Sequence, residues 1–263
     1  MPVFDLPPGL IVRCVILCVF LGAAAGSFLH CAAYRIARRE PFAKGRSRCP
    51  DCGHALGAID LIPLVNRIIL RGRCRYCGAR IPPRYFLAEL FFGLLTAAAL
   101  LRFGPSVLCL RNWLFLGCLF LLALVDAEIS EIPDGALLAA ALIWLAALPL
   151  LWNGAVDALL HLAAGVAYGG GILLLSLVTD RLLKRESLGG GDVKLLAVIG
   201  LYLGFMPTLF ALILACVLGL AQALATKKTG GKQFPFGPAL SAAAAVMLFF
   251  GQPLAEWYLG LFL

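Results

Sequence analysis

Charged side chains are scarce in this 263-residue chain, where Asp, Glu, Lys and Arg together make up only 14% of the residues. Soluble domains carry about 25% charged and roughly 45–50% apolar residues. Here hydrophobic residues make up 62%, and the mean hydropathy is +0.96. This composition excludes a single soluble globular domain and a disordered or fibrous chain, and it indicates a polytopic membrane protein.

Histidine is also scarce. The chain has only three, His30, His54 and His161, and they are scattered along it. They suggest no Ser–His–Asp or Cys–His arrangement for nucleophilic catalysis. The glycines before Asp192 lack the Gly-Lys-Ser/Thr of a phosphate-binding loop, so that class of site is excluded as well.

Long apolar stretches are abundant, and a stretch of roughly 17–25 residues predicts a membrane helix. We predict about eight, although some are short: residues 10–34, 85–103, 111–125, 136–152, 156–178, 193–205, 208–225 and 238–250. Arg13 gives the first stretch the charged flank of a signal peptide, but its apolar part continues and a basic segment follows, which favours a membrane helix. The expected fold is an all-α polytopic membrane protein.

The basic residues predict the topology. Of the 22 Lys and Arg, all but Arg13, Arg102 and Arg111 fall on one side of the eight predicted spans, and twelve of them lie in residues 35–84. Positive residues stay cytoplasmic, so we expect the N-terminus outside the membrane and the loop on the cytoplasmic side. The net charge of +8 then reflects topology and contact with anionic lipids, and not binding to nucleic acid.

The predicted cytoplasmic loop contains two C-x-x-C pairs, Cys49 with Cys52 and Cys74 with Cys77, and a glycine follows each pair. Two such pairs in one loop are typical of a tetrahedral structural zinc site, because four thiolates leave no open coordination position. Two disulfides or a redox-active pair are the alternatives, and the reducing cytosol argues against disulfides. His54 is a minor alternative ligand. Residues 61–72, between the pairs, are apolar and basic and are expected on the membrane surface.

The remaining cysteines stand singly in apolar stretches and are interpreted as small hydrophobic side chains: Cys14, Cys18, Cys31, Cys109, Cys118 and Cys216.

Two aspartates stand out because acidic side chains near membrane depth are costly and often functional. Asp126 ends the third predicted span, and Asp192 follows a triple glycine and begins the sixth. The predicted topology places both at cytoplasmic ends, where they can meet. A pair of close carboxyl groups can share one proton and hydrolyse a peptide bond. The alternatives are that Asp192 caps a helix and that Asp126 is an interfacial residue paired with a lysine.

Other acidic residues have simpler interpretations. Asp134 is expected to cap a helix, and Glu89 either pairs with Arg84 or lines a polar cavity. The remaining ones are expected to be interfacial or solvated loop charges: Glu128, Glu131, Asp157, Asp180 and Glu186.

Several motifs, in the same order, resemble those of bacterial type IV prepilin peptidases. They are GSFLHCAAYR (Gly26–Arg35), RGRCRYCGARIPPRYFLAEL (Arg71–Leu90), VDAEISEIPD (Val125–Asp134), GGGDVKLL (Gly189–Leu196) and FPFGPAL (Phe234–Leu240), together with both cysteine pairs. The resemblance places the catalytic aspartates at Asp126 and Asp192 and the zinc ligands at Cys49, Cys52, Cys74 and Cys77. It covers almost the whole chain, with His30 where the family commonly has asparagine.

The resemblance implies an enzyme with two activities. It would cleave the short basic leader from prepilins or pseudopilins on the cytoplasmic side, after a glycine, and then methylate the new amine with S-adenosylmethionine. It implies three parts: a first membrane helix (residues 1–34), a methyltransferase-associated zinc loop (residues 35–84) and a peptidase domain (residues 85–263). The residues that bind S-adenosylmethionine are not identified. A peptidase without the methyltransferase, or a non-enzymatic scaffold or transporter, would be the alternatives.

Overall fold

The computed structural model describes residues 7–41, 47–49, 51–57, 60, 62–65, 69–151, 154–184, 189–226 and 235–261. The regular elements in these ranges are helices, and extended pairing among them is limited to two isolated bridges, Arg48 with Ala55 and Arg73 with Arg80. The predicted all-α class is therefore confirmed.

Eight α-helices coincide with the eight predicted apolar spans. They are α1 (Pro8–Ala37), α3 (Pro83–Phe103), α4 (Val107–Ile129), α5 (Asp134–Ala147), α6 (Ala155–Leu183), α7 (Gly190–Leu203), α8 (Phe205–Thr226) and α9 (Gly237–Leu259), and a 3₁₀ turn η3 (Leu148–Leu150) follows α5. Six of them, all except α5 and α7, are long and apolar enough to cross a membrane. The chain is thus a multi-pass membrane protein with six candidate spans.

The two remaining helices, α5 and α7, are too short for their lengths to support the predicted count of eight membrane spans. Helices α5 and α7 have 14 residues each. At 1.5 Å per residue such a helix is about 21 Å long, whereas the hydrocarbon core of a bilayer is about 30 Å thick. An eight-span topology stays a prediction.

Contacts divide the chain into two compact units, Met1–Cys109 (unit 1) and Leu110–Leu263 (unit 2). The division falls inside α4, and it groups α3 with α1. The predicted functional division at residues 34 and 84 rests on the motifs and stays a prediction.

Glycines bring α1 and α3 of unit 1 into close contact. A Cβ atom on Gly26 would lie 2.9 Å from the Cβ of Phe92, and one on Gly93 would lie 2.7 Å from the carbonyl oxygen of Val19. Gly22, one turn before Gly26, faces Thr96 in the same way. Small residues four apart are typical of helix pairs in membranes, because they let the backbones approach.

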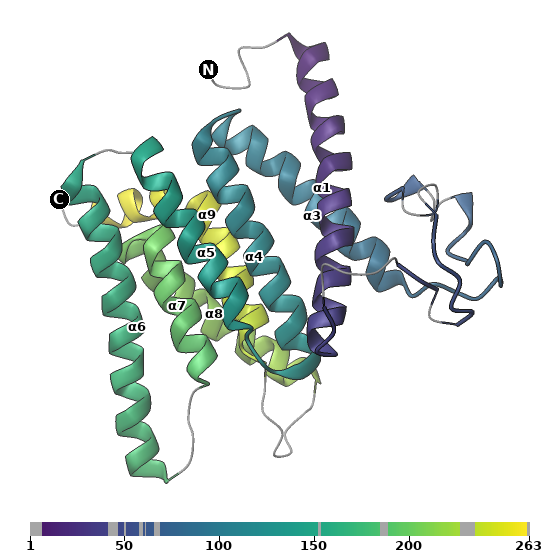
Figure 1. Ribbon diagram of the computed structural model, residues 1–263. Coiled ribbons are helices and arrows are strands. Elements are labelled where there is room, and N and C mark those ends of the chain that lie inside the picture. The colour runs from purple at the N-terminus through teal and green to yellow at the C-terminus, as the bar shows by residue number, and fades with distance from the viewer. Residues whose placement is uncertain are drawn as a thin grey trace. The chain divides into compact units, whose positions relative to one another are not determined.

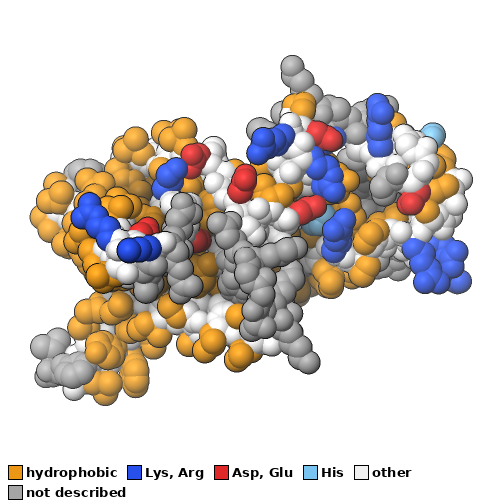
Figure 2. Space-filling view, turned by 90° about the horizontal axis from the view of Figure 1, so that it is seen from below, with side chains coloured by type: hydrophobic (Ala, Val, Ile, Leu, Met, Phe, Trp, Pro, Cys, Tyr) orange, Lys and Arg blue, Asp and Glu red, His pale blue; other side chains and the backbone are white. Residues whose placement is uncertain are grey.

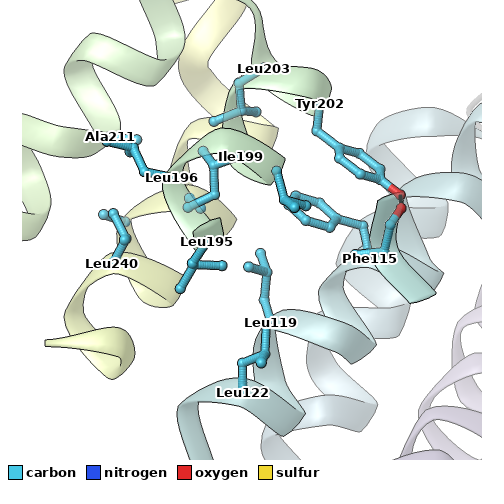
Figure 3. Packing of buried hydrophobic residues seen from close by; sticks show 14 of the residues in the cluster. Phe115, Leu119, Leu122, Leu195, Leu196, Ile199, Tyr202, Leu203, Ala211 and Leu240 are labelled. Carbon is cyan, nitrogen blue, oxygen red and sulfur yellow. Dashed lines mark hydrogen bonds between the residues drawn. The ribbon is translucent and has the colours of Figure 1, made fainter. Parts of the chain in front are cut away.

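Helix α7 lies in the core of unit 2 (Figure 1). It packs closely against α6 and also contacts α5, α8 and α9. Figure 3 shows Leu195, Leu196 and Ile199 of α7 among side chains from α4, α8 and α9. The ring of Tyr202 stacks on that of Phe115, with centroids 3.6 Å apart. This packing holds the beginning of α7 in a fixed place.

The outer helices expose large hydrophobic side chains. Val166 and Leu182 on α6 are 67% and 76% exposed, and Leu224 on α8 is 71% exposed. A continuous apolar exterior of this kind is expected where lipid is the solvent. The view from below shows charged side chains of both signs on the same face as hydrophobic ones (Figure 2).

Candidate active site and metal centre

The two cysteine pairs of unit 1 fold into equivalent turns. The backbone N–H of Gly53 donates to the carbonyl oxygen of Cys49 (2.9 Å), and that of Gly78 donates to Cys74 (3.0 Å). Both glycines have a positive φ, +69° and +72°, a conformation that glycine adopts without steric cost. The glycine after each pair therefore allows a tight turn.

These turns bring four thiols together. The Sγ atoms of Cys49, Cys52, Cys74 and Cys77 all lie within 4.8 Å of one another, and those of Cys49 and Cys77 are 3.8 Å apart. A tetrahedral zinc ion with Zn–S bonds of about 2.3 Å requires a similar spacing between sulfurs. Backbone N–H groups of Cys77 and Tyr76 lower the pKa of the Cys74 thiol to about 7, whereas desolvation and the neighbouring thiols raise the pKa of Cys77. The cluster could hold a metal ion.

Asp60 connects the two turns. Its carboxylate accepts hydrogen bonds from the backbone N–H of Gly57 (3.0 Å) and the hydroxyl of Tyr76 (3.1 Å), and it pairs with Arg75 (3.0 Å). The Gly57 N–H is the main cause that lowers the pKa of Asp60, with help from Tyr76 and Arg75. His54 stacks on the Tyr76 ring, with centroids 3.7 Å apart.

Asp126 lies near the end of α4 in unit 2, where its side chain is almost completely buried, at 4% exposed. One carboxylate oxygen, Oδ2, accepts a hydrogen bond of 2.9 Å from the backbone N–H of Gly237, the first residue of α9. The first N–H groups of a helix have no partner within the helix and carry partial positive charge. The start of α9 is therefore suited to hold a carboxylate, and Asp126 forms no ion pair with a lysine among the described residues.

Asp192 is the third residue of α7, which begins at Gly190. Gly189 occupies the N-cap position and no side chain caps the helix, so the alternative that Asp192 is the N-cap is wrong. Its Oδ1 atom is buried and has no hydrogen-bond partner among the described residues. Buried polar atoms in proteins are nearly always paired, so an unpaired carboxylate oxygen here points to a site that receives another molecule.

The structure brings these two aspartates together at one end of unit 2. The carboxyl groups are close enough for the charge of Asp126 to act on Asp192. The end of α4 and the beginnings of α5, α7 and α9 meet at the lower end of unit 2 in Figure 1. Contacts of Gly191 with Ile132, and of Gly237 with Asp126, agree with this arrangement.

Two other acidic residues have partners that the sequence did not predict. Asp134 does not cap α5: Pro133 is the N-cap, and Asp134 instead forms an exposed ion pair of 2.7 Å with Lys194. Glu89 accepts a hydrogen bond of 2.9 Å from the backbone N–H of Leu64. This bond ties the loop to α3, a contact with a backbone group that sequence patterns do not reveal.

Gly237 is the site residue that sequence reasoning missed. It lies in the FPFGPAL motif, which contributed to the resemblance without any assigned role. A Gly-Pro step before an apolar run marks a helix start, but its partner Asp126 is 111 residues away.

Some predicted features lie outside the described residues. Among them are Glu186, part of the 61–72 segment, Phe234, and seven of the basic residues used for the topology: Lys44, Arg46, Arg67, Arg185, Lys227, Lys228 and Lys232. Glu131 is exposed in the loop after α4, as expected, whereas Glu128 is exposed in the last turn of α4 and not in a loop.

Two family models match the chain. A bacterial peptidase A24 N-terminal domain matches residues 20–103, and the type IV leader peptidase family matches residues 113–224.

Curated relatives match over most of the chain, and each carries the name prepilin leader peptidase/N-methyltransferase. One from Burkholderia pseudomallei (strain 1026b) is 37% identical over 85% of this chain and 73% of its own length. One from Aeromonas hydrophila is 35% identical over 83% and 76%, and one from Bacillus subtilis (strain 168) is 31% identical over 90% and 95%. No solved structure matches the chain.

Proposed function

The chain belongs to the type IV leader peptidase family, and from this premise we propose that it removes the leader of prepilins or pseudopilins with Asp126 and Asp192. Membership confirms the predicted resemblance and the expectation of a peptidase. The observation that carries the proposed mechanism is the pair of carboxyl groups at one end of unit 2, one of them held by the start of α9.

In the proposed reaction the two carboxyl groups hold one proton between them. The ionised group takes a proton from a water molecule, whose oxygen attacks the carbonyl carbon of the scissile peptide bond. The protonated group then donates its proton to the departing nitrogen as the C–N bond breaks. The products are the leader with a free carboxylate and a mature pilin with a free amine.

The Gly237 N–H supports this division of roles. It donates to Oδ2 of Asp126, and a hydrogen bond from a donor favours the ionised form of a carboxyl group. Asp192 has an unpaired oxygen at the same end of the unit. We therefore assign the general base to Asp126 and the proton donor to Asp192 at the start of the reaction.

The glycines before Asp192 differ in their surroundings. A Cβ atom on Gly190 would meet nothing within 4 Å, whereas one on Gly191 would lie 2.8 Å from the Cβ of Ile132. Gly190 thus leaves open space beside Asp192, where an extended substrate backbone can approach. Gly191 is needed for packing.

Gly190→Ala and Gly191→Ala are expected to have different effects, the first on KM and the second on stability. Gly191→Ala overpacks the contact with Ile132 and should lower stability by roughly 1–3 kcal/mol, a loss that the added change Ile132→Ala should relieve. Gly190→Ala should leave the melting temperature in detergent unchanged or slightly higher and should raise KM. Equal loss of thermal stability in both single variants would contradict this assignment of roles.

Gly237→Ala is expected to lower kcat/KM for a prepilin by about 100-fold, because displacing a catalytic group by an ångström can cost that much. The added Cβ would lie 2.7 Å from Oδ2 of Asp126, and the buried carboxylate would have to move. Gly171→Ala on α6 is the matched control, since its Cβ meets nothing within 4 Å. Wild-type kinetics for Gly237→Ala would rule out Gly237 as a positioning residue.

We further propose that the enzyme methylates the new N-terminal amine. S-adenosylmethionine would supply the methyl group: the amine nitrogen attacks the methyl carbon, the carbon–sulfur bond breaks, and a proton leaves the nitrogen. Mass spectrometry of a pilin processed by the purified chain tests this, with and without added S-adenosylmethionine. If the active enzyme cleaves the prepilin but the product is not methylated, the result would favour the alternative of a peptidase without methyltransferase activity.

The zinc site and the topology complete the proposal. Cys49, Cys52, Cys74 and Cys77 would hold one structural zinc, which fixes the loop and takes no part in hydrolysis. The N-terminus would face outward from the inner membrane, with the loop and both aspartates on the cytoplasmic side, where the leader lies. A scaffold or transporter would instead predict normal prepilin processing when either aspartate is changed.

A further inference from the structure

A pocket of about 940 Å³ lies in unit 1, where the cysteine loop meets the beginning of α3. Three arginines line it, Arg71, Arg73 and Arg80, and the described residues that line it include no acidic or aromatic side chain. Its remaining walls include the apolar side chains of Ile69 and Ile81. The pocket is thus both cationic and partly apolar.

The three arginines line the same pocket, although like charges repel one another. Arg73 and Arg80 are directly opposite in an antiparallel bridge, and like charges so placed are destabilising. Arg71 has a φ of +49°, which is uncommon for a residue other than glycine. Among the described residues no ion pair is recorded for any of the three. An anion in the pocket would offset the repulsion, and guanidinium groups are well suited to phosphate.

The position of the pocket indicates where such an anion comes from. Pro82 and Pro83 line it, and Pro83 begins α3, a candidate membrane span. No side chain caps α3 and no acidic residue lies in its first turn, so the partial positive charge of the helix start is left for a ligand. Ile69 is 68% exposed. An exposed apolar side chain beside basic groups at the end of a span is typical of the membrane–water interface.

We propose that this pocket binds the phosphate of one anionic phospholipid headgroup, with Ile69 against the lipid and Arg71, Arg73 and Arg80 on the phosphate. The methyl donor does not fit the same pocket. S-adenosylmethionine carries a sulfonium, an ammonium and one carboxylate, so its net charge is positive, and three arginines would repel it. The inference rests on unit 1 alone and does not depend on the proposed peptidase reaction.

The test is native mass spectrometry of the full chain in a neutral detergent, titrated with phosphatidylglycerol or with phosphatidylcholine. We expect saturable retention of one phosphatidylglycerol per chain and little retention of phosphatidylcholine. The triple variant Arg71→Gln, Arg73→Gln, Arg80→Gln should bind phosphatidylglycerol about 100-fold more weakly. The variant Arg35→Gln, Arg38→Gln, Arg39→Gln loses the same charge near the end of α1 and should retain the lipid.

Further measurements keep the proposal falsifiable. The metal content of the pocket variant, compared with the wild type, shows that the cysteine loop is intact, and the triple Arg→Lys variant should retain part of the affinity if the loop fold is kept. Equal lipid loss in both glutamine variants would overturn the site. Displacement of the lipid by an equal concentration of inorganic phosphate would overturn the headgroup assignment. Loss of S-adenosylmethionine binding in the pocket variant, with lipid binding unchanged, would also overturn it.

Discussion

Asp126→Asn and Asp192→Asn are each expected to leave a prepilin uncut while the chain still inserts into the membrane. Asparagine has nearly the same size as aspartate but cannot exchange a proton, so each change removes one of the two proton-transfer groups. Loss of a general acid or base costs roughly 10²–10⁴-fold in rate. Single-turnover cleavage of a prepilin by the purified variants measures the effect directly.

A matched control is available at the same end of unit 2. Asp134 is also an aspartate, but its carboxylate is exposed and pairs with Lys194. Exposed ion pairs contribute about 0–1 kcal/mol to stability, so Asp134→Asn should cleave at close to the wild-type rate. Full cleavage by Asp126→Asn or by Asp192→Asn would refute the dyad.

The two proposed activities can also be separated with the same variants. A synthetic pilin peptide that begins at the mature amine needs no hydrolysis before methylation. Both Asp→Asn variants should methylate this peptide as the wild type does. Loss of methylation in these variants would mean that the aspartates act on the fold or on a shared substrate site, and not on hydrolysis alone.

The positions of the helices could be predicted from the sequence because apolar runs determine them. Every predicted span coincides with a helix, but the lengths of α5 and α7 depend on local stop signals. Pro133 ends the loop before α5, and Gly204 follows the last residue of α7. Such signals limit these two helices to 14 residues each, and hydropathy alone did not predict these lengths.

The turns around the cysteines were predictable because they are local. Each pair and its glycine lie within five residues, so spacing alone determines their geometry. The aspartates are different, since they are 66 residues apart. The sequence supported only the expectation that they lie at one depth, and packing of α7 in the core of unit 2 brings them together.

Hydrogen bonds from backbone N–H groups to carboxylates could not be predicted from the sequence. The bond from the Gly237 N–H to Asp126 and the bond from the Leu64 N–H to Glu89 both use a group that every residue except proline carries. No residue type marks the donor in such a bond. The capping role expected for Asp134 failed for a related reason, because Lys194 on another helix competes for its carboxylate.

Removal of the metal is expected to unfold the cysteine loop. Structural zinc contributes about 10–16 kcal/mol to the folding of small zinc-finger peptides. The described loop is otherwise held by backbone hydrogen bonds in its turns, the contacts of Asp60 and the bond from Leu64 to Glu89. A chelator, or Cys49→Ser, should therefore expose the chain between α1 and α3 to proteases. Elemental analysis should find about one zinc per wild-type chain and none in the variant.

Cys118→Ser is the matched control for the cysteine variants, since Cys118 lies on α4, outside the cysteine loop, and forms no disulfide. It should keep the zinc and the protease resistance of the loop. Cys52→Ser and Cys77→Ser test whether the exposed ligands matter as much as the buried Cys49 and Cys74. A chain that contains no metal and two disulfides, and whose loop resists proteases in the presence of a chelator, would replace the zinc site with the disulfide alternative.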